Sequence, residues 1–332
     1  MSSFSSCVPS IDERYSNQTE LSSISDEEFA DAWQPRPFKW YHRVFQIVCF
    51  IVFLGPIRVA FSLFMTLITI SLIYIIRGFL HVINAPADFG KKFCTDIASV
   101  AFRFLFFAFG HIHIKLNGKV DPEARIVIAN HTALHDPFVI VCIRYITSVM
   151  KAELSQKKLY MPILECVDPI FVDRSKSTGV SQQIIDHADN FNRPPVLIFP
   201  EGTLNNGDVL LKFHRGAFLT PYKVQPFCIR YWQPLVPKGW NTYAWTTNSI
   251  VEYIWGLVSM PPFSIIEVDA LPSITMGNEG KGDIETCTLK AQLIMANHMK
   301  VKAVDRSSDE IFKHKKPKTE IKETNDRKKK KD

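Results

Sequence analysis

Two histidines and an aspartate lie together in the stretch "ANHTALHDPF", residues 129–138, directly after the apolar run "RIVI". The apolar run predicts a strand, so His131 and Asp136 are expected in the loop that leaves its carboxyl end. A regular helix turns residues five apart through about 500°, so these two side chains can meet only where a loop turns into a helix. There Asp136 accepts a hydrogen bond from one ring nitrogen of His131 and leaves the other nitrogen to act as a base.

Three other interpretations of this stretch are open. The first is a metal site, because His131, His135 and Asp136 all carry ligand atoms. Two more histidines lie upstream, at His111 and His113, but no third ligand occurs at a characteristic spacing, so no metal is predicted. The second is a nucleophile triad, which would need an elbow such as G-x-S-x-G that the sequence lacks. The third is a plain polar turn that caps the next helix, and the ten residues alone do not exclude it.

Three further polar stretches accompany predicted strands in the same half of the chain. "PIFVDRS" places Arg174 beyond a strand end, and "FPEGT" places Glu201, Gly202 and Thr203 beyond another. "VQPFCIRY" places Pro226 at the start of a fourth strand. Ligands of open α/β sheets bind beyond the carboxyl ends of the strands, which is where a shared site is expected.

The region from residue 111 to 304 is predicted to be one α/β domain, with a mostly parallel sheet and flanking helices. Short β-rich runs alternate there with helical stretches, which is the pattern of such a fold. The expected strands are 125–130, 148–154, 169–173, 195–199, 224–232 and 264–271, and the expected helices include 177–191 and 282–303.

An apolar run over residues 44–76 precedes this domain. About 20 apolar residues cross the hydrocarbon layer of a bilayer, so residues 38–110 are predicted to form a membrane-embedded helical segment. Gly55-Pro56 interrupts the run and Arg58 follows, although a proline breaks a helix and a charge is costly in lipid. Either one helix spans from residue 59 to 76, or a re-entrant hairpin bends at the proline. Basic residues flank both ends of the run, which favours the hairpin. A shorter apolar stretch at 97–109 predicts an interfacial or core helix.

The two ends of the chain are polar. Residues 1–37 predict a disordered arm without a signal peptide, and residues 305–332 predict a disordered Lys-rich tail. Residues 300–332 hold 13 Lys or Arg and 7 Asp or Glu, which accounts for the whole net charge of +6. The tail lacks interleaved aromatic residues, so no nucleic-acid partner is expected.

The seven cysteines are scattered and odd in number, and no C-x-x-C motif occurs. That pattern argues against a disulfide framework or a structural zinc site and fits reduced thiols facing the cytosol.

The stretches around His131, Arg174, Glu201 and Pro226 resemble, in order and spacing, the four blocks of the glycerolipid acyltransferase superfamily. Further stretches are similar to the lysophosphatidylcholine acyltransferase branch, over roughly residues 38–275. They are "VMKAEL", "FPEGTLNN", "FHRGAF", "VQPFCIRY" and "YAWTTNSIVEYIWGLV".

The resemblance implies an enzyme that moves a fatty acyl group from acyl-CoA to the free hydroxyl of a lysophospholipid, with lysophosphatidylcholine as the expected acceptor. Glycerol-3-phosphate and lysophosphatidate are alternative acceptors, and an inactive membrane scaffold that binds lipid is an alternative of another class. His214 and Leu204 stand where relatives often have Lys and Cys, so the head group stays open. No cofactor is expected, because acyl-CoA is a co-substrate.

The resemblance also assigns roles. His131 would be the general base, Asp136 would orient it, and Arg174 would hold the acceptor phosphate by bidentate contact. A surface ion pair is the plain alternative for Arg174. The last five residues before the terminal aspartate, "RKKKK", resemble a dilysine retrieval signal at Lys329 and Lys330, with a generic basic end as the alternative. That signal implies the endoplasmic reticulum membrane, with the catalytic domain facing the cytosol.

The remaining roles concern the pocket walls. Glu201 and Gly202 would shape the acceptor pocket, and Glu201 would fix a neighbour or a glycerol hydroxyl because a carboxylate repels phosphate. Thr203 would add a hydroxyl donor, and Pro226 would shape the apolar acyl channel. The alternatives are a helix cap for Glu201 and an edge-strand position for Pro226.

Overall fold

A computed structural model of the chain describes residues 5–8, 12–34, 39–156, 161, 164, 169–172, 179–236, 240, 243–246, 249–275 and 284–315. Within these residues the main sheet has eight strands, in the order β2-β9-β8-β3-β6-β4-β5, with β1 paired to β8. Its strands are β1 Ser5–Val8, β2 His111–Gly118, β3 Ile126–Ala129, β4 Thr147–Lys151, β5 Ile170–Val172, β6 Val196–Ile198, β8 Val224–Pro234 and β9 Ser264–Ala270. A separate pair consists of β7 Val209–Leu210 and β10 Lys302–Ala303.

The sheet is mostly parallel, which confirms the predicted fold class. The antiparallel pairs of the main sheet, among the described strands, are β8–β9 and β1–β8. The central strand β3 is buried at every position, as expected for a parallel strand covered on both faces. The strand β2 was not predicted, although alternating apolar and polar residues, as in "HIHIKLNG", are a strand pattern. It forms at the edge of the sheet, in parallel register with β9.

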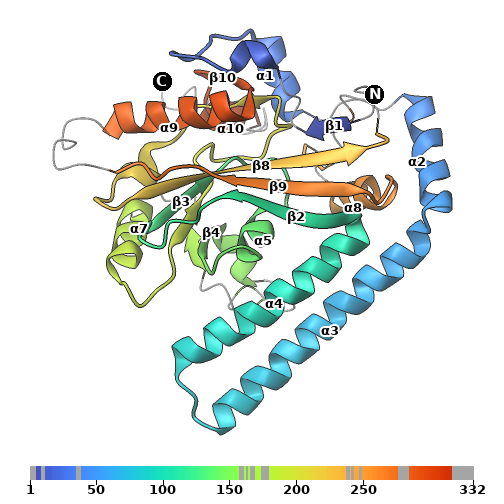
Figure 1. Cartoon of the computed structure of the whole chain (residues 1–332), viewed down its shortest axis with the longest axis vertical. Coiled ribbons are helices and arrows are strands. Elements are labelled where there is room, and N and C mark those ends of the chain that lie inside the picture. The colour runs from blue at the N-terminus through green and yellow to red at the C-terminus, as the bar shows by residue number, and fades with distance from the viewer. Residues whose placement is uncertain are drawn as a thin grey trace, which may run out of the picture.

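Helices cover both faces of the sheet (Figure 1). The described helices are α1 Asp26–Trp33, α2 Trp40–Val52, α3 Gly55–Val82, α4 Ala87–Phe109, α5 Asp136–Val141, α7 Val180–Asp189, α8 Ile250–Val258, α9 Ile284–Met299 and α10 Ser308–Lys315. Short 3-10 turns are Glu13–Tyr15, Ala152–Gln156 and Arg215–Phe218. One core cluster joins α4, α5 and α8 to the sheet, and a second joins α7 and α9 to its other face. Loops at the carboxyl ends of the parallel strands are therefore framed by helices on both sides.

The apolar run of the N-terminal region forms α2 and α3, which are separated at Phe53 and Leu54. Leu54 has a left-handed backbone with φ 54°, and Pro56 lies in the first turn of α3, where a missing N–H costs nothing. α4 folds back along α3, so the antiparallel pair is α3 with α4 rather than α2 with α3 (Figure 1). Within the described residues, α3 is the one helix long and apolar enough to cross a membrane, by length and composition.

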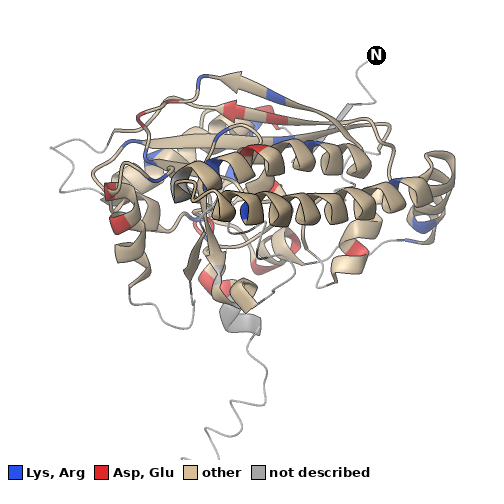
Figure 2. Ribbon diagram, turned by 90° about the horizontal axis from the view of Figure 1, so that it is seen from below, with Lys and Arg blue, Asp and Glu red and all other residues tan. Residues whose placement is uncertain are grey.

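The outer faces of α2, α3 and α4 are apolar and exposed. Seen from below the sheet, α3 and α4 carry few charged side chains along their length (Figure 2). The exposed large apolar side chains on α3 are Ile57, Leu63, Phe64, Leu67, Ile68, Leu72, Tyr74, Ile75, Phe79 and Val82. An apolar surface of this size is unusual on a soluble monomer and marks an interaction with lipid or another apolar surface.

Arg58, the charge inside this apolar segment, faces the protein. Its side chain is buried, and its guanidinium donates hydrogen bonds of 2.9 Å to the carbonyl oxygens of Ala108, Val258 and Met260. These carbonyls belong to the carboxyl-terminal ends of α4 and α8, where unpaired carbonyls need donors. Arg58 therefore fastens α3 to the α/β domain.

The N-terminal region differs from the disordered arm that its composition predicts. Residues 12–34 lie on the domain, and Phe29 of α1 packs in a small core with Leu211, Val304 and Ile311. The partners of α1 come from distant segments, so local composition could not indicate them. For the same reason α10 is ordered although it falls in the predicted tail. Lys329 and Lys330 lie outside the described residues.

Candidate active site

The turn that follows β3 is anchored to the neighbouring strand β8. The side chain of Asn130 accepts a hydrogen bond of 2.7 Å from the Ile229 N–H and donates one of 3.0 Å to the Ile229 carbonyl. This bidentate contact fixes the point at which the chain leaves the sheet. Three residues in an irregular turn, Thr132 to Leu134, then bring the chain to α5, whose first residue is Asp136.

The predicted contact between His131 and Asp136 is present. Nδ1 of His131 lies 3.0 Å from Oδ2 of Asp136, and the aspartate side chain is fully buried. The same Oδ2 accepts hydrogen bonds of 2.8 Å from the N–H groups of Thr132 and Ala133, and Tyr231 donates its hydroxyl to Oδ1. Because Asp136 accepts from Nδ1, this nitrogen carries the proton and Nε2 keeps its lone pair.

An aromatic ring supports the imidazole from one side. The rings of His131 and Phe199 are stacked, with centroids 3.9 Å apart and planes 16° apart. Phe199 directly follows β6, the strand beside β3, so the contact results from the parallel pairing of these strands. Sequence reasoning quoted this residue within "FPEGT" but assigned it no role. The stacking fixes the ring plane, while the aspartate fixes its rotation.

Glu201 holds the backbone of the histidine. Its buried carboxylate accepts hydrogen bonds from the His131 N–H at 3.2 Å, the Leu211 N–H at 2.9 Å and the Asn205 side-chain amide at 2.6 Å. Burial raises the pKa of Glu201 to about 8, although these three donors favour the charged form. The geometry matches the expectation that Glu201 fixes a neighbour. Its place in an acceptor pocket stays a prediction.

Gly202 occupies a position that only glycine can fill. Its φ is +72°, and a Cβ there would lie 2.9 Å from ring atoms of His214 and from Oγ of Ser308. His214 and Ser308 are themselves hydrogen-bonded at 2.9 Å, so neither can readily move away. The adjacent Thr203 is half-buried, and its hydroxyl donates to the Leu204 carbonyl at 3.4 Å.

Pro226, another predicted residue, is not joined to this group. Pro226 is buried within β8, in register with Ile128 of β3, and its carbonyl accepts a hydrogen bond of 2.9 Å from Leu271. It is therefore part of the sheet beneath the turn rather than an edge residue, and its role in an acyl channel stays a prediction. Arg174 lies outside the described residues, and so does its predicted phosphate contact.

A buried wall of aromatic and imidazole rings lies behind the turn, and sequence reasoning missed it. The Tyr253 hydroxyl of α8 accepts from the Leu134 N–H at 3.1 Å and lies 2.9 Å from Nδ1 of His135. The rings of His111 and His135 are 5.1 Å apart, and Tyr231 packs against both. His135, Tyr231 and Tyr253 lay within stretches quoted from the sequence, but no part in such a wall was assigned to them.

The two buried histidines are neutral. Burial lowers the pKa of His135 to about 4 and the pKa of His111 well below its usual value. Within the described part of the chain, no three His, Cys, Asp or Glu side chains are grouped as a metal would need. Among the three imidazoles of His111, His131 and His135, the one nearest to solvent is His131, because its side chain is 14% exposed.

The N-terminal helix α1 supports the loop that carries Glu201. Asn206 donates its backbone N–H to the Ala32 carbonyl at 2.7 Å and its side-chain amide to the Asp31 carbonyl at 3.0 Å. The preceding residue, Asn205, donates its own N–H to the His131 carbonyl at 3.2 Å. A continuous set of hydrogen bonds therefore runs from the end of α1 to the histidine. Chemically, the arrangement is an imidazole held by a carboxylate, which suits removal of a proton from a substrate hydroxyl.

Comparison with known proteins identifies similar sequences. Residues 112–230 match the family described as Acyltransferase. The chain is 29% identical over 222 residues to lysophospholipid acyltransferase LPCAT4 of Homo sapiens, which covers 65% of this chain and 42% of that protein. It is 32% identical over 203 residues to LPCAT4 of Xenopus tropicalis, covering 59% and 38%. It is 26% identical over 275 residues to lysophosphatidylcholine acyltransferase 1 of Danio rerio, covering 80% and 52%.

The chain thus spans about half the length, or less, of these curated relatives. Among solved structures, the 1-acyl-sn-glycerophosphate acyltransferase PlsC of Thermotoga maritima aligns with a TM-score of 0.48 and 16% identity. That alignment covers 72% of this chain and 95% of the other.

Proposed function

Since the chain belongs to the glycerolipid acyltransferase superfamily, in the branch similar to the lysophosphatidylcholine acyltransferases, we propose that it transfers a fatty acyl group from acyl-CoA to the free hydroxyl of a lysophospholipid. The observation that carries this proposal is the 3.0 Å contact of His131 Nδ1 with the buried Asp136 carboxylate. The contact leaves Nε2 as a base at the carboxyl end of a central strand.

The proposed reaction needs no covalent intermediate with the enzyme. His131 Nε2 takes the proton of the acceptor hydroxyl, and the oxygen attacks the thioester carbonyl of acyl-CoA. The tetrahedral intermediate collapses with loss of CoA thiolate, which takes the proton back from the imidazolium. Asp136 stabilises the imidazolium while it exists, as carboxylates do beside catalytic histidines.

Lysophosphatidylcholine is the proposed acceptor, with glycerol-3-phosphate and lysophosphatidate as alternatives. The printed names of the relatives support a lysophospholipid. Arg174 is proposed to hold the acceptor phosphate, because a guanidinium binds phosphate oxygens in pairs. Gly202 and Thr203 are proposed to border the acceptor, and Pro226 the acyl chain.

We further propose that the chain is embedded in the endoplasmic reticulum membrane with the catalytic domain facing the cytosol. The exposed apolar faces of α2, α3 and α4 support an attachment to lipid. The free cysteines, including Cys142 and Cys228, support a reducing compartment. Lys329 and Lys330 would supply retrieval to this membrane.

The proposed base can be tested by substitution. His131→Ala is expected to lower turnover by about 10²–10⁴, the usual contribution of a positioned base. The assay uses purified chain in detergent and labelled acyl-CoA. His113→Ala, at an exposed histidine on β2, is the matched control and should retain activity. Undiminished acyl transfer by the His131→Ala variant would contradict the role of His131 as the general base.

The acceptor is tested by a panel at fixed acyl-CoA. Lysophosphatidylcholine should be acylated faster than glycerol-3-phosphate or lysophosphatidate, and a reversed order would assign the alternative acceptor. Absence of transfer to every member of the panel would favour the inactive lipid-binding scaffold.

A further inference from the structure

Aromatic side chains gather where α2 begins, beside the segment that follows β8. Trp240, which lies between β8 and α8, packs against the first turns of α2. Its ring centroid is 3.9 Å from that of His42, 5.3 Å from that of Phe45 and 6.5 Å from that of Tyr41. The ring of Trp40 lies edge-on to Tyr41, with centroids 6.0 Å apart. We call these five residues the aromatic cluster.

The aromatic cluster is exposed on its outer side. Trp40 is 77% exposed and Tyr41 is 44% exposed, although both carry large apolar rings. Lys39 directly precedes them and is also exposed, and its ammonium lies 5.9 Å from the centre of the Tyr41 ring. Trp and Tyr combine an apolar ring with a polar N–H or O–H group, and they are enriched where a bilayer meets water. Lysines are favoured at the same depth, because their apolar stems lie in lipid while the ammonium stays in water.

The surface of α2 changes from polar to apolar along its length. Lys39 and Arg43 are exposed at its start. After Arg43, the exposed side chains of α2 and of the link to α3 are all apolar, namely Val44, Ile47, Val48, Ile51, Val52 and Leu54. The rise of a helix places Trp40 and Val52 about 18 Å apart. That length is close to the thickness of hydrocarbon in one leaflet, about 15 Å, so the gradient fits a helix that starts among head groups and descends into lipid.

The aromatic cluster is joined to the turn that carries His131. The strand β8 runs parallel to β3, so the chain leaves both strands at the same edge of the sheet, and Figure 1 shows the arrowhead of β8 directed toward α2. Shortly after Trp240, Trp245 donates its backbone N–H to the Thr132 carbonyl at 2.9 Å. Cα atoms five residues apart are separated by at most about 18 Å, so Trp240 lies close to the catalytic turn.

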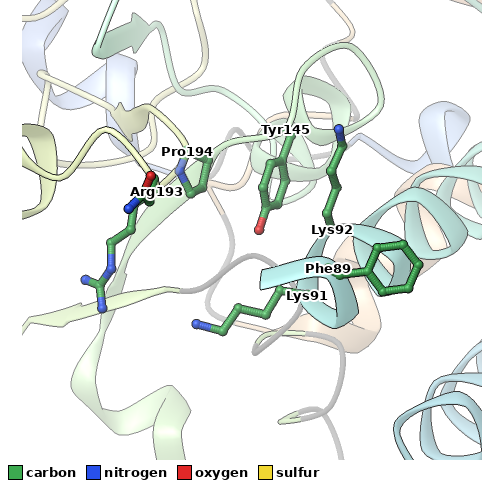
Figure 3. Close-up of a pocket in the computed structure, with 7 residues that line it drawn as sticks. Phe89, Lys91, Lys92, Tyr145, Arg193 and Pro194 are labelled. Carbon is green, nitrogen blue, oxygen red and sulfur yellow. The ribbon is translucent and has the colours of Figure 1, made fainter. Parts of the chain in front are cut away.

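The far end of α3, where α4 begins, has a different character. A cavity of about 260 Å³ lies there, between the start of α4 and the turn that precedes β6 (Figure 3). Tyr145 and Pro194, which line it, precede β4 and β6, two strands that run parallel to β3, so the cavity stands at the amino ends of these strands. None of its seven lining residues is Trp. The aromatic cluster, in contrast, stands at the carboxyl ends, beside the catalytic turn.

We propose that the aromatic cluster is the interfacial anchor of the protein. Lys39, Trp40 and Tyr41 lie at the head-group level of a phospholipid bilayer, and α2 descends from there so that Leu54 lies in the hydrocarbon layer. This inference rests on the membrane attachment proposed above and adds its depth and direction. A lipid surface is the occupant because the exposed apolar side chains of α2 and α3 continue from the cluster without a break in character. The carboxyl edge of the sheet then stands at the membrane surface.

The test measures the depth of single tryptophans in vesicles. The full-length protein is bound to phosphatidylcholine vesicles without acyl-CoA, so no transfer occurs and the result does not depend on the proposed reaction. The acyl chains carry bromine, which quenches tryptophan fluorescence, either near the ester end or near the methyl end. The fluorescence that Trp40→Phe removes should be quenched more by bromine near the ester end. Val52→Trp adds a probe at the end of α2, and its added fluorescence should be quenched more by bromine near the methyl end.

A binding measurement with the same vesicles tests whether the aromatic cluster holds the protein. Trp40→Ser with Tyr41→Ser should weaken binding by at least about 10-fold, because two aromatic side chains no longer enter the lipid. The matched control, Phe191→Ser with Leu289→Ser, removes exposed apolar side chains elsewhere and should bind as the wild type does. All four positions are exposed, so both variants should fold, and an unchanged melting temperature in detergent verifies this.

Three results would overturn the inference. Trp40 fluorescence that bromine quenches at neither depth would place the cluster in water, as a surface for a soluble partner would be. Stronger quenching of Trp40 by bromine near the methyl end would reverse the direction of α2. Equal binding by the Trp40–Tyr41 variant and the control would show that the cluster is not the anchor. Failure of the unsubstituted protein to bind the vesicles would overturn the proposed membrane attachment as well, which separates the two failures.

Discussion

The two buried carboxyl groups of the candidate site differ in what they hold. Asp136 contacts the His131 side chain, two backbone N–H groups and the Tyr231 hydroxyl. Glu201 contacts the His131 backbone and two groups of its own loop, and its pKa is raised to about 8 by burial. Asp136 therefore orients the ring, whereas Glu201 fixes the chain that carries it.

The raised pKa of Glu201 makes the stability of the protein depend on pH. The folded protein keeps a proton on Glu201 up to about pH 8, whereas the unfolded chain loses it near the ordinary value of 4.5. Between these values the folded state binds more protons, so the contribution of Glu201 to the free energy of unfolding falls as pH rises.

The Glu201→Gln variant isolates this effect, because other groups titrate equally in both proteins. The melting temperature of the wild type, relative to the variant, should be highest near pH 5 and should fall steadily toward pH 8. Thermal unfolding in detergent at a series of pH values measures it. If the melting temperature of the wild type relative to the variant stays constant or rises with pH, the raised pKa of Glu201 is contradicted.

The sequence predicted those contacts that are local. His131 and Asp136 are five residues apart, so the geometry of one loop was enough to expect their hydrogen bond. Tyr231 and Tyr253 were missed as partners of this turn because they lie 95 residues from Asp136 and 118 residues from His135. Their approach depends on how β8 and α8 pack, which no short motif encodes.

At the scale of elements, α8 connects the apolar helices α2 and α3 to the turn that carries His131. Trp255 of α8 donates its indole N–H to the Gln46 side chain of α2 at 3.2 Å, while Tyr253 holds the turn before α5. Arg58 binds the last carbonyls of the same helix. The helix α8 therefore contacts α2, α3 and the turn after His131 at the same time.

Arg58→Gln should be strongly destabilising. The change removes charged hydrogen bonds to Ala108, Val258 and Met260 and leaves buried carbonyl groups unpaired, which is expected to cost about 3 kcal/mol or more. Arg43→Gln is the control, because its ion pair with Glu252 is exposed and should contribute about 1 kcal/mol at most. Chemical denaturation in detergent compares them. Equal losses of stability in the Arg58 and Arg43 variants would contradict the role of Arg58 in holding α3 to the α/β domain.

Elements with a regular pattern were predicted, and elements defined by distant partners were not. The buried strands β3, β6 and β8 fall within predicted apolar runs, because both faces of each strand need apolar side chains. The helix α1 has only two buried apolar positions, at Phe29 and Ala32, in an acidic stretch. The position of α1 depends on its distant core partners Leu211, Val304 and Ile311 rather than on its own residues.

At the scale of the whole molecule, charge and apolar surface are separated. The outer faces of α2, α3 and α4 are apolar, whereas Lys and Arg border them near the start of α4 (Figure 2). The catalytic turn is linked to this surface through α4 and α8.

Leu63→Ser with Leu67→Ser tests the apolar surface. Both side chains are more than 60% exposed on α3, and each should contribute about 1.5–3 kcal/mol to burial in lipid. Binding to neutral phosphatidylcholine vesicles is therefore expected to weaken by at least about 100-fold. The control, Leu289→Ser with Phe191→Ser, removes exposed apolar side chains elsewhere and should bind as the wild type does. Equal binding by all three proteins would exclude α3 as the contact surface.

The position of α4 limits how this protein can be divided. Phe102 and Phe106 of α4 are buried in the main core, against Phe138 and His135 behind the catalytic turn, while the other side of α4 packs on α3. The family match begins at residue 112, after both phenylalanines. A fragment that begins at residue 112 would lack the part of its hydrophobic core that Phe102 and Phe106 supply. The helical pair and the α/β domain therefore share a single helix, and neither is a separable module.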